Sequence, residues 1–250
     1  MRVRCLVAMV SALAATLVVP AAAGQSGKWT PPRTPDGKPD LSGFWQGPLM
    51  RNFFESVGGP PFTPAGKAAY DYNMTQSINP EGLCLPAGIP RASISGVPFE
   101  IIQNTQRVAF LYELMNVWRS VPINGGVHTG ILDPYYFGNG AAKWDGDTLV
   151  VDVADLNDDP EHPTWFDSTG NYHSDALHVV ERWTRTGPDT MLYRATMEDP
   201  KVFSRPWTIE VLLYRHQEKN FRIMEYECQM FKEKLVREGK GNNLRVVENN

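Results

Sequence analysis

The segment KWDGDTLVVDV, residues 143–153, decides how this chain folds. Asp145-Gly146 stands between AAKW and DTLVVDV, and an Asp-Gly pair between two such runs predicts a β-hairpin with a two-residue type I′ turn. Downstream, HSDALHVVERW at residues 173–183 predicts another strand, because apolar and polar side chains alternate along it. Together these two segments predict an antiparallel sheet.

Further hairpins are predicted on both sides of this segment. Alternating apolar residues in RVAFLYELM and WRSVPI indicate one antiparallel pair before it. The strands expected after it are residues 176–186 with 190–197, and 207–214 with 221–228. Consecutive hairpins form a meander, which closes into a barrel or folds into a sandwich. We expect a mainly β protein with a lipocalin-like (calycin-type) antiparallel barrel, because up-and-down strand order favours closure.

The remaining segments are expected to frame this barrel. The Pro- and Gly-rich N-terminal part predicts an extended arm with Phe44 and Trp45 as its first anchors, and Thr63-Pro64 marks the start of a short helix. A second short helix is expected at residues 229–239. The predicted divisions are a signal peptide at 1–23, the arm and short helix at 24–97, the barrel at 98–239 and a frayed tail at 240–250.

The N-terminus has the pattern of a secretory signal peptide. Arg2 and Arg4 precede an apolar run from Cys5 to Val19, and small residues end at Ala23. The run is shorter than the roughly 20 residues of a membrane span, so we expect cleavage, no stable membrane insertion and a periplasmic or secreted protein. Loss of the two arginines takes the formal net charge from −4 to −6, which argues against nucleic acid as a partner.

Two of the three cysteines remain after this cleavage. In an oxidising compartment an even pair predicts a disulfide, here between Cys84 and Cys228. Closing a loop of this length is worth about 4–5 kcal/mol in chain-entropy models. Two separate buried thiols are the alternative.

Histidines and carboxylates at loops and strand ends indicate acid–base chemistry. Histidine titrates near neutral pH, and a nearby carboxylate tunes it. We expect His128 and His173 to act as acid and base, with Glu113 or Asp175 as the orienting carboxylate. The residues expected to bind the substrate are Arg119, as an anchor for an oxyanion or phenolate, with Tyr135, Tyr136, Trp144 and His178. The alternative for each histidine is a structural hydrogen bond to the backbone.

Other kinds of site lack a sequence signal. There is no HExxH motif or close Cys pair for a metal, no P-loop or dinucleotide fingerprint for a cofactor, and no G-x-S-x-G nucleophile. We therefore expect no metal and no cofactor. The predicted function is a cofactor-independent exported lyase, isomerase or hydratase acting on a small aromatic or alicyclic molecule. A periplasmic small-molecule carrier and a structural envelope protein are the alternatives, and the oligomeric state is left open.

Several motifs also resemble one protein family. They are PDGKPDLSGFW at 35–45, CLPAGIPR at 84–91, WDGDTLVVDV at 144–153, HSDALHVVERW at 173–183 and DPKVFSRPWT at 199–208. This set is similar to a family of exported bacterial proteins with recurrent PDLSGxW, WEGDTLVVDT and HSDALHVTER motifs. The resemblance implies export and the same fold, but no particular reaction. The residues to which it points are Glu113, Arg119, His128, Trp144, Asp147, His173, Asp175, His178 and Glu181. The chain departs from the family at His128-Thr129, where a His-Pro pair is usual, and at residues 133–136.

Overall fold

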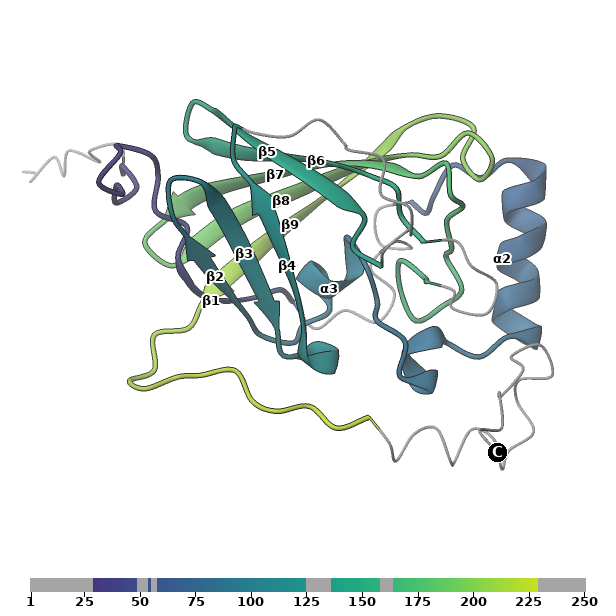
Figure 1. Cartoon of the computed structure of the whole chain (residues 1–250). Coiled ribbons are helices and arrows are strands. Elements are labelled where there is room, and N and C mark those ends of the chain that lie inside the picture. The colour runs from purple at the N-terminus through teal and green to yellow at the C-terminus, as the bar shows by residue number, and fades with distance from the viewer. Residues whose placement is uncertain (1–28, 49–53, 55–57, 125–135, 158–163, 229–250) are drawn as a thin grey trace, which may run out of the picture.

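A computed structural model describes residues 29–48, 54, 58–124, 136–157 and 164–228. Nine strands form one antiparallel sheet in the order β4-β3-β2-β1-β9-β8-β7-β6-β5 (Figure 1). Their bounds are β1 Gly43–Gln46, β2 Phe99–Gln103, β3 Arg107–Tyr112, β4 Val117–Pro122, β5 Asn139–Asp145, β6 Thr148–Ala154, β7 His178–Gly187, β8 Thr190–Glu198 and β9 Trp207–Arg215. The predicted lipocalin-like barrel is confirmed, because the sheet curls into a nearly closed barrel.

The two ends of the sheet, β4 and β5, meet at a junction that we call the seam. An odd number of strands cannot close with antiparallel neighbours throughout, so one neighbouring pair has to be parallel. Ile123, just after β4, forms a single parallel bridge with Ala142 of β5, and the amide of Asn124 donates to the Ala142 carbonyl at 2.9 Å. Among the described residues, strand pairing across the seam is confined to this bridge. The first part of β4 therefore borders the seam without a strand partner on that side.

Alternation along the strands builds the core. In β9, WTIEVLLYR, every second residue from Trp207 to Leu213 is buried, and the residues between them are exposed. The inward faces of neighbouring strands bring large aromatic side chains together, and Trp45, Trp183 and Tyr193 are fully buried. Burial of apolar surface at about 25 cal/mol per Å² is the main force that closes the barrel.

The predicted hairpin after Trp144 forms, but its turn lies one residue further along. Asp145 pairs with Thr148, so the two turn residues are Gly146 and Asp147. Gly146 has a φ of 57°, and a glycine at the first turn position is the pattern of a type II′ turn, whose twist suits a hairpin as well. The expected type I′ turn at Asp145-Gly146 is therefore wrong, because Asp145 still belongs to the strand. The hairpin around Pro188-Asp189 is confirmed.

The third predicted hairpin is wrong. Residues 221–228 form no strand, and the neighbour of β9 is β1, through Trp45 opposite Arg215 and Gln46 opposite Tyr214. Segment 221–228 contains no buried residue, so it has no apolar face to turn toward the core. Trp45 has such a side chain, and its burial draws part of the predicted arm into the barrel wall.

Segment 221–228 instead runs outside the barrel, and we call it the C-terminal strap. Its first residue, Phe221, packs edge-on against Phe44 of β1, with ring centroids 5.2 Å apart. At its other end Cys228 is bonded to Cys84, with the two Cα atoms 5.6 Å apart. The predicted disulfide is therefore confirmed, and it ties the strap to the segment before β2.

Helices occupy the connections between strands. The predicted helix α2, Pro64–Gln76, is confirmed, and the Thr63 side chain caps it by accepting from the amide of Gly66 at 3.0 Å. The shorter helices are η1 Pro80–Leu83, α3 Arg91–Ile94 and η2 Leu114–Asn116. In the described part of the chain, no helix is long and apolar enough to cross a membrane. The helix expected at 229–239 lies outside the described residues.

Candidate functional site

A cluster of charged and phenolic side chains lies inside the barrel. Arg119 of β4 and Glu181 of β7 occupy inward-facing positions and are 7% and 0% exposed. The guanidinium reaches both carboxylate oxygens, Nη1 to Oε2 at 2.6 Å and Nη2 to Oε1 at 2.9 Å. Tyr193 of β8 donates its hydroxyl to Glu181 Oε1 at 2.8 Å. We call Arg119, Glu181 and Tyr193, with Tyr112, the interior cluster.

Tyr112 connects the interior cluster to the end of the barrel. Its hydroxyl lies 3.0 Å from Ser93 Oγ of helix α3, and both residues are buried. The Arg119 guanidinium carbon lies 4.4 Å from the ring centroid of Phe110, on the neighbouring strand β3. Short helix α3 is thus fastened over the barrel end by a polar contact rather than by apolar packing alone.

The interior cluster holds one positive and one negative charge. Burial alone would lower the pKa of the Arg119 guanidinium, but Glu181, Tyr112 and Tyr193 together outweigh burial and raise that pKa above its ordinary value. Burial also raises the pKa of Tyr112, and burial together with Glu181 raises the pKa of Tyr193 well above 10.0. At neutral pH Arg119 therefore stays a guanidinium, and both tyrosines stay neutral phenols. With the formal charge of Glu181, the interior cluster carries one charge of each sign.

A cleft of about 700 Å³ opens along the seam, and Arg119 is one of its lining residues. We call it the seam cleft. The other lining residues are Pro86, Arg107, Asn116, Val117, Trp118, Ser120, Pro122, Tyr136, Phe137, Gly138, Asn139 and Gly140. The cleft follows the part of β4 that has no strand partner across the seam. Incomplete closure of the nine-stranded barrel therefore creates the space.

The seam cleft is connected to both the interior cluster and the C-terminal strap. Phe137, on its wall, stacks on the Tyr112 ring at 5.4 Å with an interplanar angle of 5°. Asn116 donates from Nδ2 to the Tyr226 carbonyl at 2.7 Å and accepts from the Tyr226 amide at 3.1 Å. Because Cys228 follows two residues later, the disulfide holds the strap where it contacts the cleft. The cleft border thus depends on segments far apart in sequence.

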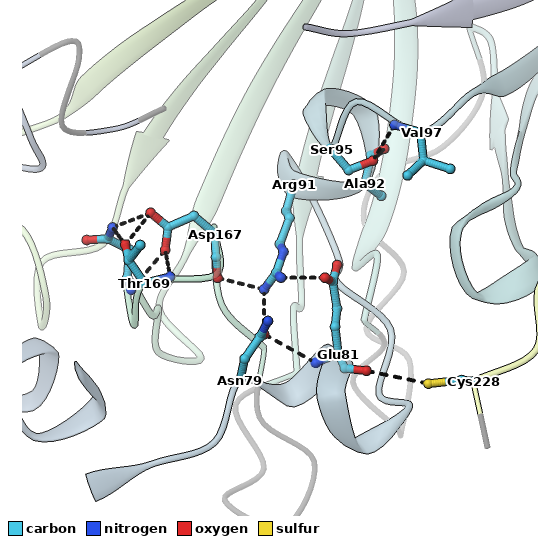
Figure 2. Close-up of polar contacts among 10 residues, drawn as sticks. Asn79, Glu81, Arg91, Ala92, Ser95, Val97, Asp167, Thr169 and Cys228 are labelled. Carbon is cyan, nitrogen blue, oxygen red and sulfur yellow. Dashed lines mark hydrogen bonds and ion pairs between the residues drawn. The ribbon is translucent and has the colours of Figure 1, made fainter. Parts of the chain in front are cut away.

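A second buried cluster holds the loops at the end of the barrel (Figure 2). Arg91 donates from Nη1 to the Asp167 carbonyl at 2.6 Å and to Asn79 Oδ1 at 3.0 Å, and its Nη2 pairs with Glu81. Burial raises the pKa of Glu81, and Arg91 opposes that shift. The Asp167 carboxylate is itself engaged by its own loop, through Thr169 and Asn171. Arg91 therefore joins α3, η1 and the loop before β7, which is a structural role.

Among the expected acid–base residues, His173 and Asp175 have contacts of their own. His173 is 5% exposed and packs against Phe166, with ring centroids 5.4 Å apart. Its Nε2 is hydrogen-bonded to Thr164, and its Nδ1 lies 3.1 Å from the Ser174 carbonyl. Asp175 is exposed, and a hydrogen bond from Lys201 lowers its pKa. Neither His173 nor Asp175 lines the seam cleft.

The other carboxylates and Trp144 have contacts of their own. The carboxylate of Glu113, at the turn between β3 and β4, accepts from the Met224 amide of the strap at 2.8 Å. Asp147 pairs with Arg33 at the surface, with a shortest distance of 2.7 Å. Trp144 is partly buried and packs against the core. These residues lie away from the walls of the seam cleft.

His178 has a carboxylate partner on the neighbouring strand β6. On β7 it points away from the inward face that carries Glu181, as the sequence predicts. Its Nε2 lies 2.7 Å from Asp152 Oδ1, and both side chains are about half exposed, at 41% and 47%. Strand pairing places Gly140 opposite Val153, and Val153 opposite the neighbour of His178. His178 is therefore two strands from the cleft edge.

Among the expected ligand-binding residues, Arg119 and Tyr136 line the seam cleft. His128 and Tyr135 lie outside the described residues. In the described part of the chain, no group of three or more His, Cys, Asp or Glu side chains is placed to hold a metal ion.

The sequence predicts no functional role for Tyr112, Tyr193 or Arg91. Tyr112 and Tyr193 alternate with apolar residues, so they are predicted as ordinary core side chains. A carboxylate at position 181, within the apolar row Leu177, Val179 and Trp183, is the signal that polar partners face it across the barrel. Arg91, at the end of CLPAGIPR, carries a weaker signal, because its partners come from three separate segments.

Comparison with known proteins adds no relative. No protein-family model matches this chain, and no curated protein aligns with it significantly. The motif resemblance to exported bacterial proteins therefore stays a prediction, and the site is interpreted from its own geometry.

Proposed function

We propose that this protein is an exported carrier that binds a small, partly aromatic molecule in the seam cleft. The observation that carries this proposal is a cleft of about 700 Å³ that reaches a buried, charged side chain, Arg119. Ligand sites are typically concave, mostly apolar and about 300–1,000 Å³ in volume, with a few polar groups that orient the ligand. The seam cleft has this composition, with Trp118 and Phe137 as aromatic walls.

The proposal that this protein is exported rests on two other observations. The Cys84–Cys228 disulfide closes a 144-residue separation and holds the strap in place, and such bonds persist in oxidising compartments. The signal-peptide pattern of residues 1–23 leads to the same compartment. We therefore place the carrier in the periplasm or outside the cell. Mass spectrometry of the secreted protein should find Gly24 as its first residue, and a retained N-terminus would contradict export by this route.

The binding proposal is tested with a neutral fluorescent probe, N-phenyl-1-naphthylamine. We expect saturable binding to the full chain, and at least a fivefold weaker affinity after Ser120→Trp, which places an indole in the seam cleft. Leu212→Trp is the matched control, because Leu212 is an exposed apolar residue on the outer side of β9, away from the cleft. Unchanged affinity in Ser120→Trp, or an equal loss in Leu212→Trp, would contradict the cleft as the site.

A second candidate function is acid–base catalysis without a cofactor, of the lyase, isomerase or hydratase type. It is favoured by the half-exposed His178–Asp152 pair, in which a carboxylate oxygen lies 2.7 Å from an imidazole nitrogen, an arrangement suited to proton transfer. Proton transfer by a positioned side chain contributes about 10²–10⁴-fold to a rate. His178→Gln should therefore slow any turnover by at least about 100-fold.

A test of the catalytic function requires a substrate that co-purifies with the protein. Small molecules retained on purification are returned to the apo-protein, and conversion is followed by mass spectrometry. His216→Gln is the control, because His216 stacks on Phe221 beside β9, away from this pair. The acid–base candidate is contradicted if the wild-type protein converts none of these molecules, or if His178→Gln, His173→Ala and His128→Ala all leave conversion unchanged.

A further inference from the structure

We infer that the seam cleft selects an uncharged, flat aromatic molecule with one hydrogen-bond acceptor, in preference to an anion of the same shape. This inference rests on the proposed binding function and specifies the chemistry of its ligand. It follows from the charges at the cleft, from the donor that Arg119 leaves free and from the shape of the walls.

The charges at the cleft disfavour a cationic ligand. Among the described residues, its lining includes two arginines, Arg107 and Arg119, and no aspartate or glutamate. A ligand ammonium group would therefore find two guanidinium groups and no carboxylate partner among these lining residues. Aromatic faces attract cations only modestly at exposed sites, and the two guanidinium groups oppose that attraction.

An anionic ligand is disfavoured by the pairing of Arg119. Both terminal nitrogens of its guanidinium already face the Glu181 carboxylate, at 2.6 and 2.9 Å. A ligand carboxylate beside Arg119 would bring a second buried anion close to Glu181 without bringing a new cation. Removing a carboxylate from water is costly unless it gains a partner of its own.

Arg107 does not compensate for this cost. Its side chain is exposed at the rim of the cleft, and its only described side-chain hydrogen bond is a long one of 3.4 Å to Ser120 Oγ. An ion pair formed in contact with water is weak and is screened by salt. It can speed the approach of an anion but adds little to its affinity.

One lining residue of the cleft carries a buried donor without a described partner. Arg119 Nε is buried and, among the described residues, has no hydrogen-bond partner. A buried donor left unpaired is unfavourable, so a ligand oxygen that accepts from Nε recovers that loss. The oxygen of a ketone, amide or ester can do this without adding a charge to the neutral interior cluster.

The walls of the seam cleft favour a ligand with a flat ring system. Trp118, Tyr136 and Phe137 supply aromatic surface, and Phe137 is held in place by its stack on Tyr112. On the β5 side, the lining residues Gly138 and Gly140 have no side chains. The wall at Gly138 is therefore bare backbone, against which a planar molecule can lie.

Three isosteric probes separate these alternatives by isothermal titration calorimetry on the full chain. They are 2-acetylnaphthalene, which carries a neutral acceptor, 2-ethylnaphthalene, which lacks it, and 2-naphthoate, which carries the charge. We expect 2-acetylnaphthalene to bind at least about tenfold more tightly than 2-ethylnaphthalene, the factor for a hydrogen bond to a charged donor. We expect 2-naphthoate to bind at least about tenfold more weakly than 2-acetylnaphthalene.

The double variant Arg119→Met with Glu181→Gln tests the source of the preference. It removes both charges together, so no unpaired ion is left in the barrel. The advantage of 2-acetylnaphthalene over 2-ethylnaphthalene should disappear, while the binding of 2-ethylnaphthalene should stay within about threefold. An advantage that survives in this variant would overturn the role of Arg119 Nε.

The outcomes also distinguish this inference from the proposed function. If 2-naphthoate binds as tightly as 2-acetylnaphthalene or more tightly, and Ser120→Trp weakens both, the cleft binds ligands but the preference for a neutral molecule is wrong. If none of the three probes binds, or if Ser120→Trp leaves their binding unchanged, the proposed binding function fails and this inference fails with it.

Discussion

Removing Arg119 alone should destabilise the protein strongly. Arg119→Met leaves Glu181, which is 0% exposed, with the Tyr193 hydroxyl as its remaining described hydrogen bond. Breaking a buried pair from one side costs about 3–5 kcal/mol, because an uncompensated charge stays in the interior. A domain of about this size loses about 2–4 °C in melting temperature per kcal/mol. We therefore expect a decrease of about 6–20 °C.

Replacing both partners should recover most of this loss. In Arg119→Met with Glu181→Gln no charge remains, and the new side-chain amide oxygen at position 181 still accepts from Tyr193. Buried ion pairs are often replaced by neutral groups at little cost, so the double variant should be at least about 2 kcal/mol more stable than the single one. Urea unfolding followed by tryptophan fluorescence and circular dichroism measures both values.

A surface pair provides the control for this comparison. Arg194 and Glu210 lie on the outer face of β8 and β9, with side chains 47% and 51% exposed. Arg194→Met should change the unfolding free energy by about 1 kcal/mol or less. The reasoning is refuted if Arg119→Met is as mild as Arg194→Met, or if the double variant is as unstable as Arg119→Met.

Three further predictions concern other parts of the molecule. In the folded protein the pKa of Tyr193 is raised well above its usual value of 10.0. The contribution of neutral Tyr193 to the unfolding free energy is therefore complete below about pH 10 and is lost as the pH rises further. Tyr193→Phe should flatten this alkaline decline in the unfolding free energy. Replacing Cys84 and Cys228 by serine should lower the free energy of unfolding, measured with urea, by about 2–5 kcal/mol. A decrease below about 1 kcal/mol would show that tying down the strap adds little to stability. The exposed pair of Arg33 with Asp147 should contribute at most about 1 kcal/mol, measured with Arg33→Gln, and a loss above about 2 kcal/mol would contradict that.

The strands were predictable where burial alternates strictly with exposure. Segments such as TLVVDVA and WTIEVLLYR carry that period themselves, so β6 and β9 follow from local sequence. Strand β1 has only four residues and sits in a Pro- and Gly-rich segment, so its period is too short to recognise. Its place in the barrel depends on burial of Trp45 and on a partner strand, β9, near the other end of the described chain.

The candidate site was less predictable than the fold. Alternation places Arg119 and Glu181 on inward or outward faces but does not say which side chains meet across the barrel. That pairing depends on closure of the sheet, which brings β4 and β7 to face each other. His173 was selected because histidine suits proton transfer, yet its buried ring is hydrogen-bonded within the loops. Residue type alone could not separate these two roles.

The central claim is that the seam cleft binds a small aromatic molecule. A crystal structure of the full chain with N-phenyl-1-naphthylamine tests it most directly. We expect the probe between β4 and residues 136–140, with its rings against Trp118 and Phe137. A probe bound elsewhere, such as in the hollow between Gln46 and His216, with the seam cleft unoccupied, would contradict the claim.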